Sequence, residues 1–236
     1  MLAALVWTLW LSLGAILEWP ASEPVAADAV IVLGEDPGHR YLRGKELLLA
    51  GYADTLMLIL PLPHVLGDAT GNLKGVAVHV DRSADSTWTE ARVMRRWMEA
   101  NGIRHVLVVS DPQHLLRVSY SWWSVFRSSG LRYTFVAAPT PEWSAWNWWH
   151  NKATAIGVGM EVLKLGYYVG RYRFGWGSDG HHGLCRPQSL VMPASSPAHH
   201  FAATMPAEYD ANSWGLVLRS ARYPSRVIGA DLVESA

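Results

Sequence analysis

The sequence predicts an α/β fold, a three-layer Rossmann-like arrangement with a doubly wound, mostly parallel sheet of about five strands behind an N-terminal transmembrane helix. Three observations lead to this prediction. The run DAVIVL at 28–33 is apolar after its first residue, which is typical of a strand buried on both faces. Segments with helical patterns separate this run from similar ones, and that alternation implies right-handed βαβ crossovers. An uncharged stretch opens the chain.

Strands are expected at 28–33, 55–60, 75–80, 105–110 and 132–138, and helices at 40–50, 87–100 and 114–127, with a closing helix around 161–168. Gly51 is the residue type that commonly follows the end of a helix. Pro61 and Pro63 end the second strand because proline cannot donate a ladder hydrogen bond. Ligands of such sheets bind beyond the carboxyl ends of the strands, so the residues that follow each strand are the candidates for a site.

Residues 1–20 are predicted to be a membrane anchor or a signal segment. Residues 2–17 carry no charge, and as a helix they would extend about 24 Å, slightly less than the ~30 Å hydrocarbon core. An uncleaved anchor is favoured because signal peptides begin with basic residues, whereas the first Lys or Arg here is Arg40. A signal cleaved near Ala21 and a buried helix are the alternatives. One apolar segment of this kind predicts a single-pass protein of the inner (plasma) membrane, and the acidic residues that follow it favour a domain on the extracytoplasmic side.

Composition excludes several functional classes. The 236 residues include 20 basic and 20 acidic ones, and this zero net charge argues against a nucleic-acid-binding protein, which needs a basic face. The single Cys excludes an internal disulfide and a cysteine-based zinc site, and no metal site is predicted. Only 17% of residues are charged and 13 are Trp, which favours a protein that contacts a membrane.

Beyond the anchor, composition divides the chain into an α/β domain at 27–173 and a tail at 175–236. The tail is rich in Gly, Ser, Ala and Pro without a sustained period, so it is predicted to be of low complexity and disordered. Near the end of the domain, residues 142–149 contain a dense group of tryptophans. Two interpretations stay open for this group, packing beneath the sheet or lying in a membrane interface.

Three polar segments follow predicted strands and are candidates for a site. One of them is residues 81–90. Thr87 and Glu90 have the spacing of a capping box, in which each side chain bonds a backbone amide of the other residue, and that would explain both without a site. In the functional interpretation Asp81 points into the crevice from its strand end, and the amides at the start of the helix hold an anion.

The second polar segment contains Ser110, His114 and Arg117. The last two are three residues apart at a helix start and therefore share a face. A histidine that transfers protons beside an arginine that binds an oxyanion suits phosphate or phosphate-ester chemistry. The alternative is a surface arginine and a histidine bonded to a backbone carbonyl.

The third segment is a loop-to-helix junction with Gly34, Arg40 and Arg43, and the two arginines could converge on one anion. The nucleotide-binding patterns GxGxxG and GxxxxGK[ST] are both missing. Farther along the chain, Glu161 and Lys164 are expected to form an ordinary ion pair on a helix surface.

Taken together, the motifs resemble the YdcF/SanA/ElyC-like family of bacterial envelope-associated proteins. The resemblance covers residues 27–168 and is carried by the segments ADAVIVLGEDPGHRYLRGKELLLAGYADTLML, VDRSADSTWTEA, VLVVSDPQHLLRVSYSWW and MEVLKLGYY. Two departures are evident. The second strand ends in LPLP at 60–63 where the family has Ser-Gly-Gly, and Asp81 stands where the family usually has Glu.

The resemblance implies a Rossmann-like domain, often behind a membrane anchor, with a polar pocket at the strand ends. The family positions of that pocket correspond here to Gly34, Arg40, Arg43, Asp81, Thr87, Glu90, His114 and Arg117. It also implies a role in cell-envelope integrity and in handling of the polyprenyl-phosphate lipid carrier. One soluble member is associated with S-adenosylmethionine, which makes this cofactor a candidate here.

The leading hypothesis is a membrane-anchored envelope protein, with a role such as peptidoglycan biosynthesis, that binds or processes an anionic, phosphorylated small molecule or lipid-linked precursor. As an enzyme it would be a hydrolase or transferase with His114 as acid/base and Asp81 or Glu90 as its orienting group or general base. The ligand-binding residues would be Gly34, Arg40, Arg43, Thr87, Ser110 and Arg117. The alternatives are a module that binds a nucleotide-like ligand such as S-adenosylmethionine, and a scaffold without chemistry.

Overall fold

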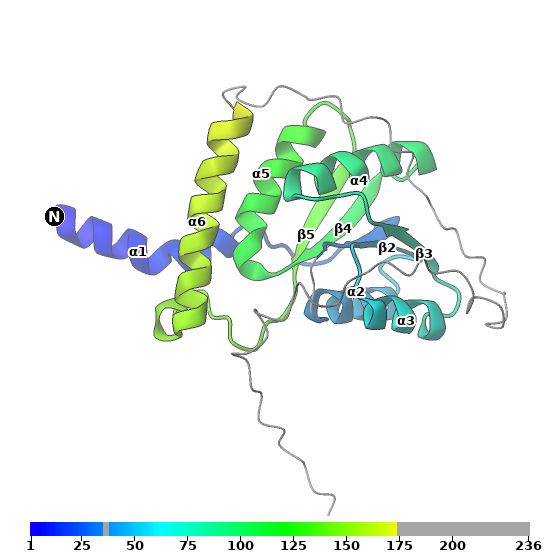
Figure 1. The fold of residues 1–236 in the computed structure, drawn as a ribbon, viewed down its shortest axis with the longest axis horizontal. Coiled ribbons are helices and arrows are strands. Elements are labelled where there is room, and N and C mark those ends of the chain that lie inside the picture. The colour runs from blue at the N-terminus through cyan, green and yellow to red at the C-terminus, as the bar shows by residue number, and fades with distance from the viewer. Residues whose placement is uncertain (35–37, 174–236) are drawn as a thin grey trace, which may run out of the picture. The chain divides into compact units, whose positions relative to one another are not determined.

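The computed structural model describes residues 1–34 and 38–173, so the predicted tail at 175–236 lies outside the described residues. Parallel strands alternate with helices along the chain (Figure 1). The strands are β1 (Ala29–Val32), β2 (Thr55–Ile59), β3 (Ala77–Asp81), β4 (His105–Ser110) and β5 (Arg132–Ala137). The helices are α1 (Leu2–Glu18), α2 (His39–Leu49), α3 (Pro63–Asn72), α4 (Thr87–Asn101), α5 (Leu115–Phe126) and α6 (Lys152–Arg173), with the 3-10 turns η1 (Pro112–His114) and η2 (Trp148–His150).

The predicted α/β class is confirmed by a five-stranded, wholly parallel sheet in the order β3-β2-β1-β4-β5. Val32 of β1 is in register with Leu58 of β2 and with Val109 of β4, so the carboxyl ends of these three strands are level. The chain leaves β1 toward one face of the sheet through α2, and leaves the adjacent β4 toward the other face through α5. This divergence makes the edge between β1 and β4 the switch point of the sheet, where ligands of open α/β folds bind.

Two separate hydrophobic cores explain the uninterrupted apolar strands. Side chains that alternate along β1 point to opposite faces, so Ile31 packs among residues of α4 and α5 while Val30 packs among residues of α2 and α3. Every residue of β1 and β4 is buried. A central strand of this kind cannot alternate apolar and polar residues, because neither of its faces meets water.

Helix α3, in the connection between β2 and β3, is not predicted from the sequence. The sequence predicts that Pro63 ends a strand, whereas it occupies the first turn of α3, where its missing amide proton removes no helical bond. Only Val65 and Ala69 of this helix are buried. With so narrow an apolar face and two internal glycines, α3 has a weak helical signal.

Helix α1 has 17 residues, and within the described parts of the chain no helix meets the length and hydropathy needed to cross a membrane. Its second half packs onto the α/β domain. Gly14 approaches the chain before η2 so closely that a Cβ at this position would lie 2.3 Å from the carbonyl oxygen of Ala145. After α1 the chain runs beside the outer strand, where the amide of Ser22 donates to the carbonyl of Phe135.

The tryptophan group at 142–149 has a divided environment. Trp148 is 1% exposed and packs with Leu17 of α1 and Val158 of α6, and its ring centroid lies 4.9 Å from that of Trp10. Trp146, by contrast, remains 64% exposed. Trp148 therefore belongs to a small core that holds α1 on the domain, whereas Trp146 stays on the surface. Neither of the two interpretations from the sequence describes the whole group.

Candidate functional site

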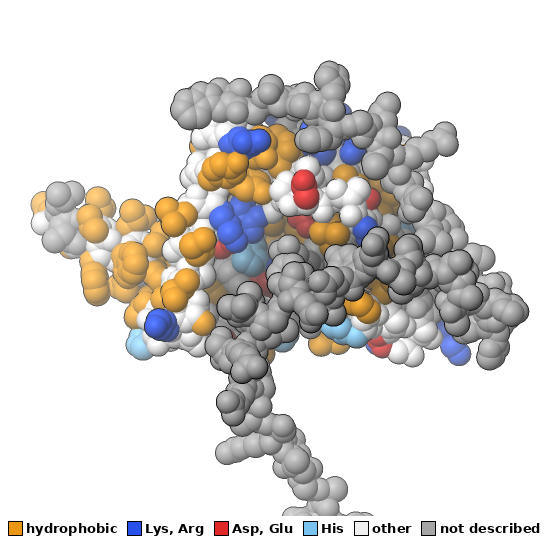
Figure 2. All heavy atoms as spheres, in the orientation of Figure 1, with side chains coloured by type: hydrophobic (Ala, Val, Ile, Leu, Met, Phe, Trp, Pro, Cys, Tyr) orange, Lys and Arg blue, Asp and Glu red, His pale blue; other side chains and the backbone are white. Residues whose placement is uncertain are grey.

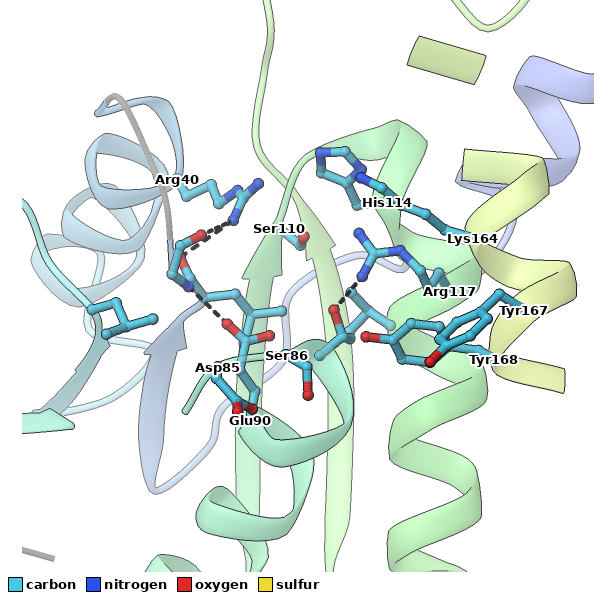
Figure 3. Close-up of a pocket in the computed structure, with 15 residues that line it drawn as sticks. Arg40, Asp85, Ser86, Glu90, Ser110, His114, Arg117, Lys164, Tyr167 and Tyr168 are labelled. Atoms are coloured by element: carbon cyan, nitrogen blue, oxygen red, sulfur yellow. Dashed lines mark hydrogen bonds between the residues drawn. The ribbon is translucent and has the colours of Figure 1, made fainter. Parts of the chain in front are cut away.

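A cavity of about 410 Å³ lies at the carboxyl ends of β1 and β4, at the switch point of the sheet (Figure 3). Leu33 and Gly34 follow β1 and line one side of it, and Ser110 ends β4 and lines the next. The starts of α2, α4 and α5 supply most of the polar walls, and α6 closes the remaining side. The cavity therefore stands where the topology of the sheet predicts a ligand.

Most of the predicted site residues meet in this cavity, namely Gly34, Arg40, Thr87, Glu90, Ser110, His114 and Arg117. Two predicted residues do not line it. Asp81 is 6% exposed and accepts hydrogen bonds from the backbone amide and hydroxyl of Ser83, so it closes a local turn at the end of β3. Arg43 pairs with Glu46 on the surface of α2 at 2.9 Å, so it does not share an anion site with Arg40.

The loop after β1 is closed by tight contacts around Gly34 that leave little room for a side chain. The amide of Gly34 donates to Glu90 Oε1 at 3.1 Å, and a Cβ at position 34 would lie only 3.1 Å from the carbonyl oxygen of Ile59. Next to Ile59, Leu60 has a φ of 45°, a left-handed conformation that costs a side-chain-bearing residue about 1–2 kcal/mol. Leu60 lines the cavity and gives this wall an apolar surface.

Arg40, in the first turn of α2, is 8% exposed and is held from two directions. Its Nη1 donates to the carbonyl of Gly34 at 2.5 Å, and its Nη2 donates to Asp111 Oδ2 at 2.8 Å. Burial by itself raises the pKa of the Asp111 carboxyl, but the hydrogen bond and charge of Arg40 outweigh it and hold that pKa below its usual value. The ionised Asp111 therefore orients Arg40 from outside the cavity lining.

The capping box predicted for Thr87 and Glu90 is wrong by one residue. The N-cap of α4 is Ser86, whose hydroxyl accepts from the amide of Thr89, while the Thr89 hydroxyl accepts from the amide of Ser86. Thr87 and Glu90 are thereby released from capping, and they accept hydrogen bonds from Arg117 Nη1 and from the Gly34 amide. The local interpretation, which competed with a functional one, does not apply to either residue.

Glu161 is the buried centre of the ionic contacts on the α6 side. Its side chain is 1% exposed and contacts three cationic or titratable groups. These are Arg117 Nε at 2.7 Å, His114 Nδ1 at 3.1 Å and Lys164 Nζ at 3.1 Å. Burial raises the pKa of the Glu161 carboxyl, yet the contacts with His114 and Arg117 more than offset this and lower it strongly. The predicted Glu161–Lys164 pair exists, but it is one part of a buried group of charges.

His114 stands between two carboxylates. Its Nδ1 faces Glu161, and its Nε2 lies 3.5 Å from Asp111 Oδ2. The predicted orienting carboxylate is Asp81 or Glu90, whereas in the structure Glu161 and Asp111 lie next to the His114 ring. A histidine whose ring is oriented by carboxylates in this way has the geometry of a general acid or base.

Several lining residues were not predicted, namely Leu60, Asp85, Ser86, Lys164, Tyr167 and Tyr168. Lys164, Tyr167 and Tyr168 come from α6, which lies far along the chain and packs beside α5 (Figure 1). Arg117 lies 5.8 Å from the ring centre of Tyr168, within cation–π range. The available signal was the closing motif EVLKLGYY, whose Glu161 and Lys164 were interpreted as a surface pair.

The lining of the cavity carries charges of both signs, with the cations on two sides of it. Arg40, Arg117 and Lys164 are the cationic lining residues, and Asp85 and Glu90 are the acidic ones. The carboxylates that pair with the cations, Asp111 and Glu161, are not lining residues. Within residues 1–34 and 38–173, no group of three or more His, Cys, Asp and Glu side chains is arranged to hold a metal ion.

Comparison with protein-family models gives no match to this chain, and comparison with curated proteins finds no similar sequence. The family resemblance therefore stays a hypothesis that rests on the quoted motifs.

Proposed function

We propose that this protein binds a phosphorylated ligand in the cavity between β1 and β4 while α1 anchors it in a membrane, as expected of an envelope-biogenesis protein of the inner membrane. One observation carries the proposal. Arg117, Lys164 and His114 converge on the same buried carboxylate, Glu161, and all three also line the cavity. A buried carboxylate that orients cations toward a cavity prepares them to bind an anion there.

The donor inventory of Arg117 supports this ligand class. A guanidinium carries five N–H groups, and among the described contacts Arg117 directs one each from Nε, Nη1 and Nη2 to Glu161 and Thr87. Donors of Arg117 and of Lys164 therefore remain for phosphate oxygens. The planar fork of arginine suits such oxygens because two parallel hydrogen bonds can form at once.

For a reaction, His114 is the group that would transfer a proton, with Glu161 as the positioning residue behind it. The cavity volume of about 410 Å³ is larger than a phosphate needs. Leu60, Tyr167 and Tyr168 line it and offer apolar and aromatic surface to the rest of a ligand. These features support a phosphate-ester hydrolase or transferase that acts on a ligand with an apolar or planar part.

A second candidate, a nucleotide-like ligand such as S-adenosylmethionine, is favoured by one observation. Tyr167 and Tyr168 lie on the cavity wall, where an aromatic ring can stack on a base. The carboxylates of Asp85 and Glu90, which also line the cavity, would serve ribose hydroxyls.

Calorimetric titration of the detergent-solubilised full chain tests the proposal with farnesyl phosphate, farnesol and S-adenosylmethionine as probes. We expect heat with farnesyl phosphate and none with farnesol. Arg117→Lys should weaken farnesyl phosphate binding about tenfold or more, because a point charge replaces a bidentate fork. Arg43→Lys is the matched control, since Arg43 lies outside the cavity. Equal affinity of the two variants would contradict the proposal, and heat with S-adenosylmethionine alone would favour the second candidate.

A further inference from the structure

Helix α6 carries an exposed apolar stripe on its outer side. Ile156, Met160, Leu163 and Tyr167 are 57%, 48%, 68% and 58% exposed. Their spacing of four, three and four residues places them on one face of the helix. Hydrophobic side chains gather over α6 and over the neighbouring α1 in the same view (Figure 2). A row of large apolar side chains from 156 to 167 is unusual on a helix surface that faces only water.

The solvent-facing charges that α6 itself carries near this stripe are basic. The ionisable residues of α6 other than tyrosines are Lys152, Lys164, Arg171 and Arg173 together with a single acid, Glu161. Glu161 is 1% exposed and points into the interior group of charges, so the solvent-facing charge of α6 is entirely positive. An apolar stripe with a basic border matches the interface of an anionic bilayer, where apolar side chains enter the acyl region and basic side chains meet headgroups.

The position of α6 beside α1 brings the stripe to the same surface. The inner half of α1 packs near α6 through Leu17 and Val158, whereas Leu5, Val6, Trp7 and Leu9 of its outer half remain exposed. These four positions point in different directions around the helix axis, so contact with a single flat surface would leave part of the outer half exposed, whereas insertion into hydrocarbon would cover it on all sides. In Figure 1, the outer half of α1 extends past α6 and away from the sheet.

We infer that the outer face of α6 is a membrane-docking surface that lies on the headgroup region of an anionic bilayer beside the inserted outer half of α1. The inference rests on the proposed anchoring by α1 and adds a second contact that orients the domain. Its consequence concerns the cavity, because Lys164 and Tyr167 belong both to the cavity lining and to the docking helix. The cavity then opens at the level of the lipid headgroups.

Nitroxide labels on the full chain test the inference in vesicles of phosphatidylethanolamine and phosphatidylglycerol. The single native cysteine is removed by Cys185→Ser, and one label is then attached at Leu9→Cys, Leu163→Cys or Leu49→Cys. Leu49 is 73% exposed on α2 and is the matched control for Leu163. The ratio of collisions with oxygen to collisions with a water-soluble nickel chelate measures contact with lipid. We expect a ratio several-fold higher at positions 9 and 163 than at 49. Adding Met160→Glu should lower the ratio at 163 to the value at 49, while adding Leu42→Glu should leave it unchanged.

The outcomes separate the two claims. A lipid-exposed label at 9 with a water-exposed label at 163 overturns the docking surface and leaves the anchor. A water-exposed label at 9 overturns the anchoring by α1, and titration with farnesyl phosphate then still tests the cavity. A label at 163 that is shielded from both collision partners, with dipolar coupling to another label, assigns the stripe to a second copy of the chain and overturns the inference.

Discussion

The carboxylates of Asp68 and Glu161 each contact three polar side chains, but Asp68 is partly exposed and Glu161 is buried. Asp68 of α3 accepts hydrogen bonds from Tyr41 Oη, Lys45 Nζ and Asn72 Nδ2, and it joins α3 to α2. Glu161 of α6 contacts His114, Arg117 and Lys164, and it joins α6 to α5. The side chain of Asp68 is 33% exposed and that of Glu161 is 1% exposed.

The pKa values of the two carboxylates shift in the same direction, but the groups differ in their position relative to the cavity. Hydrogen bonds from Lys45, Tyr41 and Asn72 lower the pKa of Asp68 to about 2, and the contacts of Glu161 also lower its pKa. The Asp68 group lies outside the cavity, whereas the partners of Glu161 line it. A perturbed pKa is therefore no sufficient sign of a site, and the informative feature is a buried carboxylate whose cationic partners face a cavity.

Neutralising the buried carboxylate of Glu161 should have the largest effect on the free energy of unfolding. Glu161→Gln leaves Arg117 without its ionic partner in a nearly inaccessible position, and this should lower the free energy of unfolding by about 3 kcal/mol. Asp68→Asn should lower it much less, because water screens and replaces the lost contacts. Urea unfolding of both variants measures the difference. Equal shifts of the two midpoints would show that burial does not distinguish the groups.

The pH dependence of stability should show the same contrast with a smaller effect. The pKa of Glu161 is lowered from 4.5, so its contribution is complete above pH 4.5 and is lost as the pH falls toward the folded-state value. Asp68 follows the same sign between 3.8 and about 2. Wild type should lose stability as the pH falls below 4.5, and Glu161→Gln should flatten this decline more than Asp68→Asn. Urea midpoints at pH 5 and pH 3 provide the measurement, and parallel slopes for all three proteins would refute the assignment.

The smallest effect on stability, and the clearest on function, should come from the exposed lysine of each group. Lys164 and Lys45 are 48% and 25% exposed, and replacing either by Gln should change the melting temperature little. Lys164→Gln should weaken farnesyl phosphate binding several-fold, since Lys164 lines the cavity, while Lys45→Gln should leave it unchanged. Equal affinities in the calorimeter would remove Lys164 from the site.

The parts of the site that lie close together in the sequence are predictable from it. His114 and Arg117 were paired from their spacing at a helix start after a strand, and the structure places both in the cavity. Thr87 and Glu90 are also predicted site residues that line the cavity, but from the sequence a capping box explains them equally well, because a hydroxyl three residues before a glutamate fits that motif. The true cap, Ser86 with Thr89, differs by one residue, and short polar motifs do not resolve such a shift.

The sequence by itself determined the α/β class, because strands buried on both faces must be continuously apolar and helices between parallel strands must cross over the sheet. It also determined that polar residues follow β1 and β4. Only the tertiary structure decided which of them meet, since Glu161 and His114 are far apart in the chain and come together through the packing of α6 beside α5. The structure also decided where Arg43 and Asp81 point. Arg43 lies on a face of α2 that turns away from the cavity, and a local turn at the end of β3 holds Asp81.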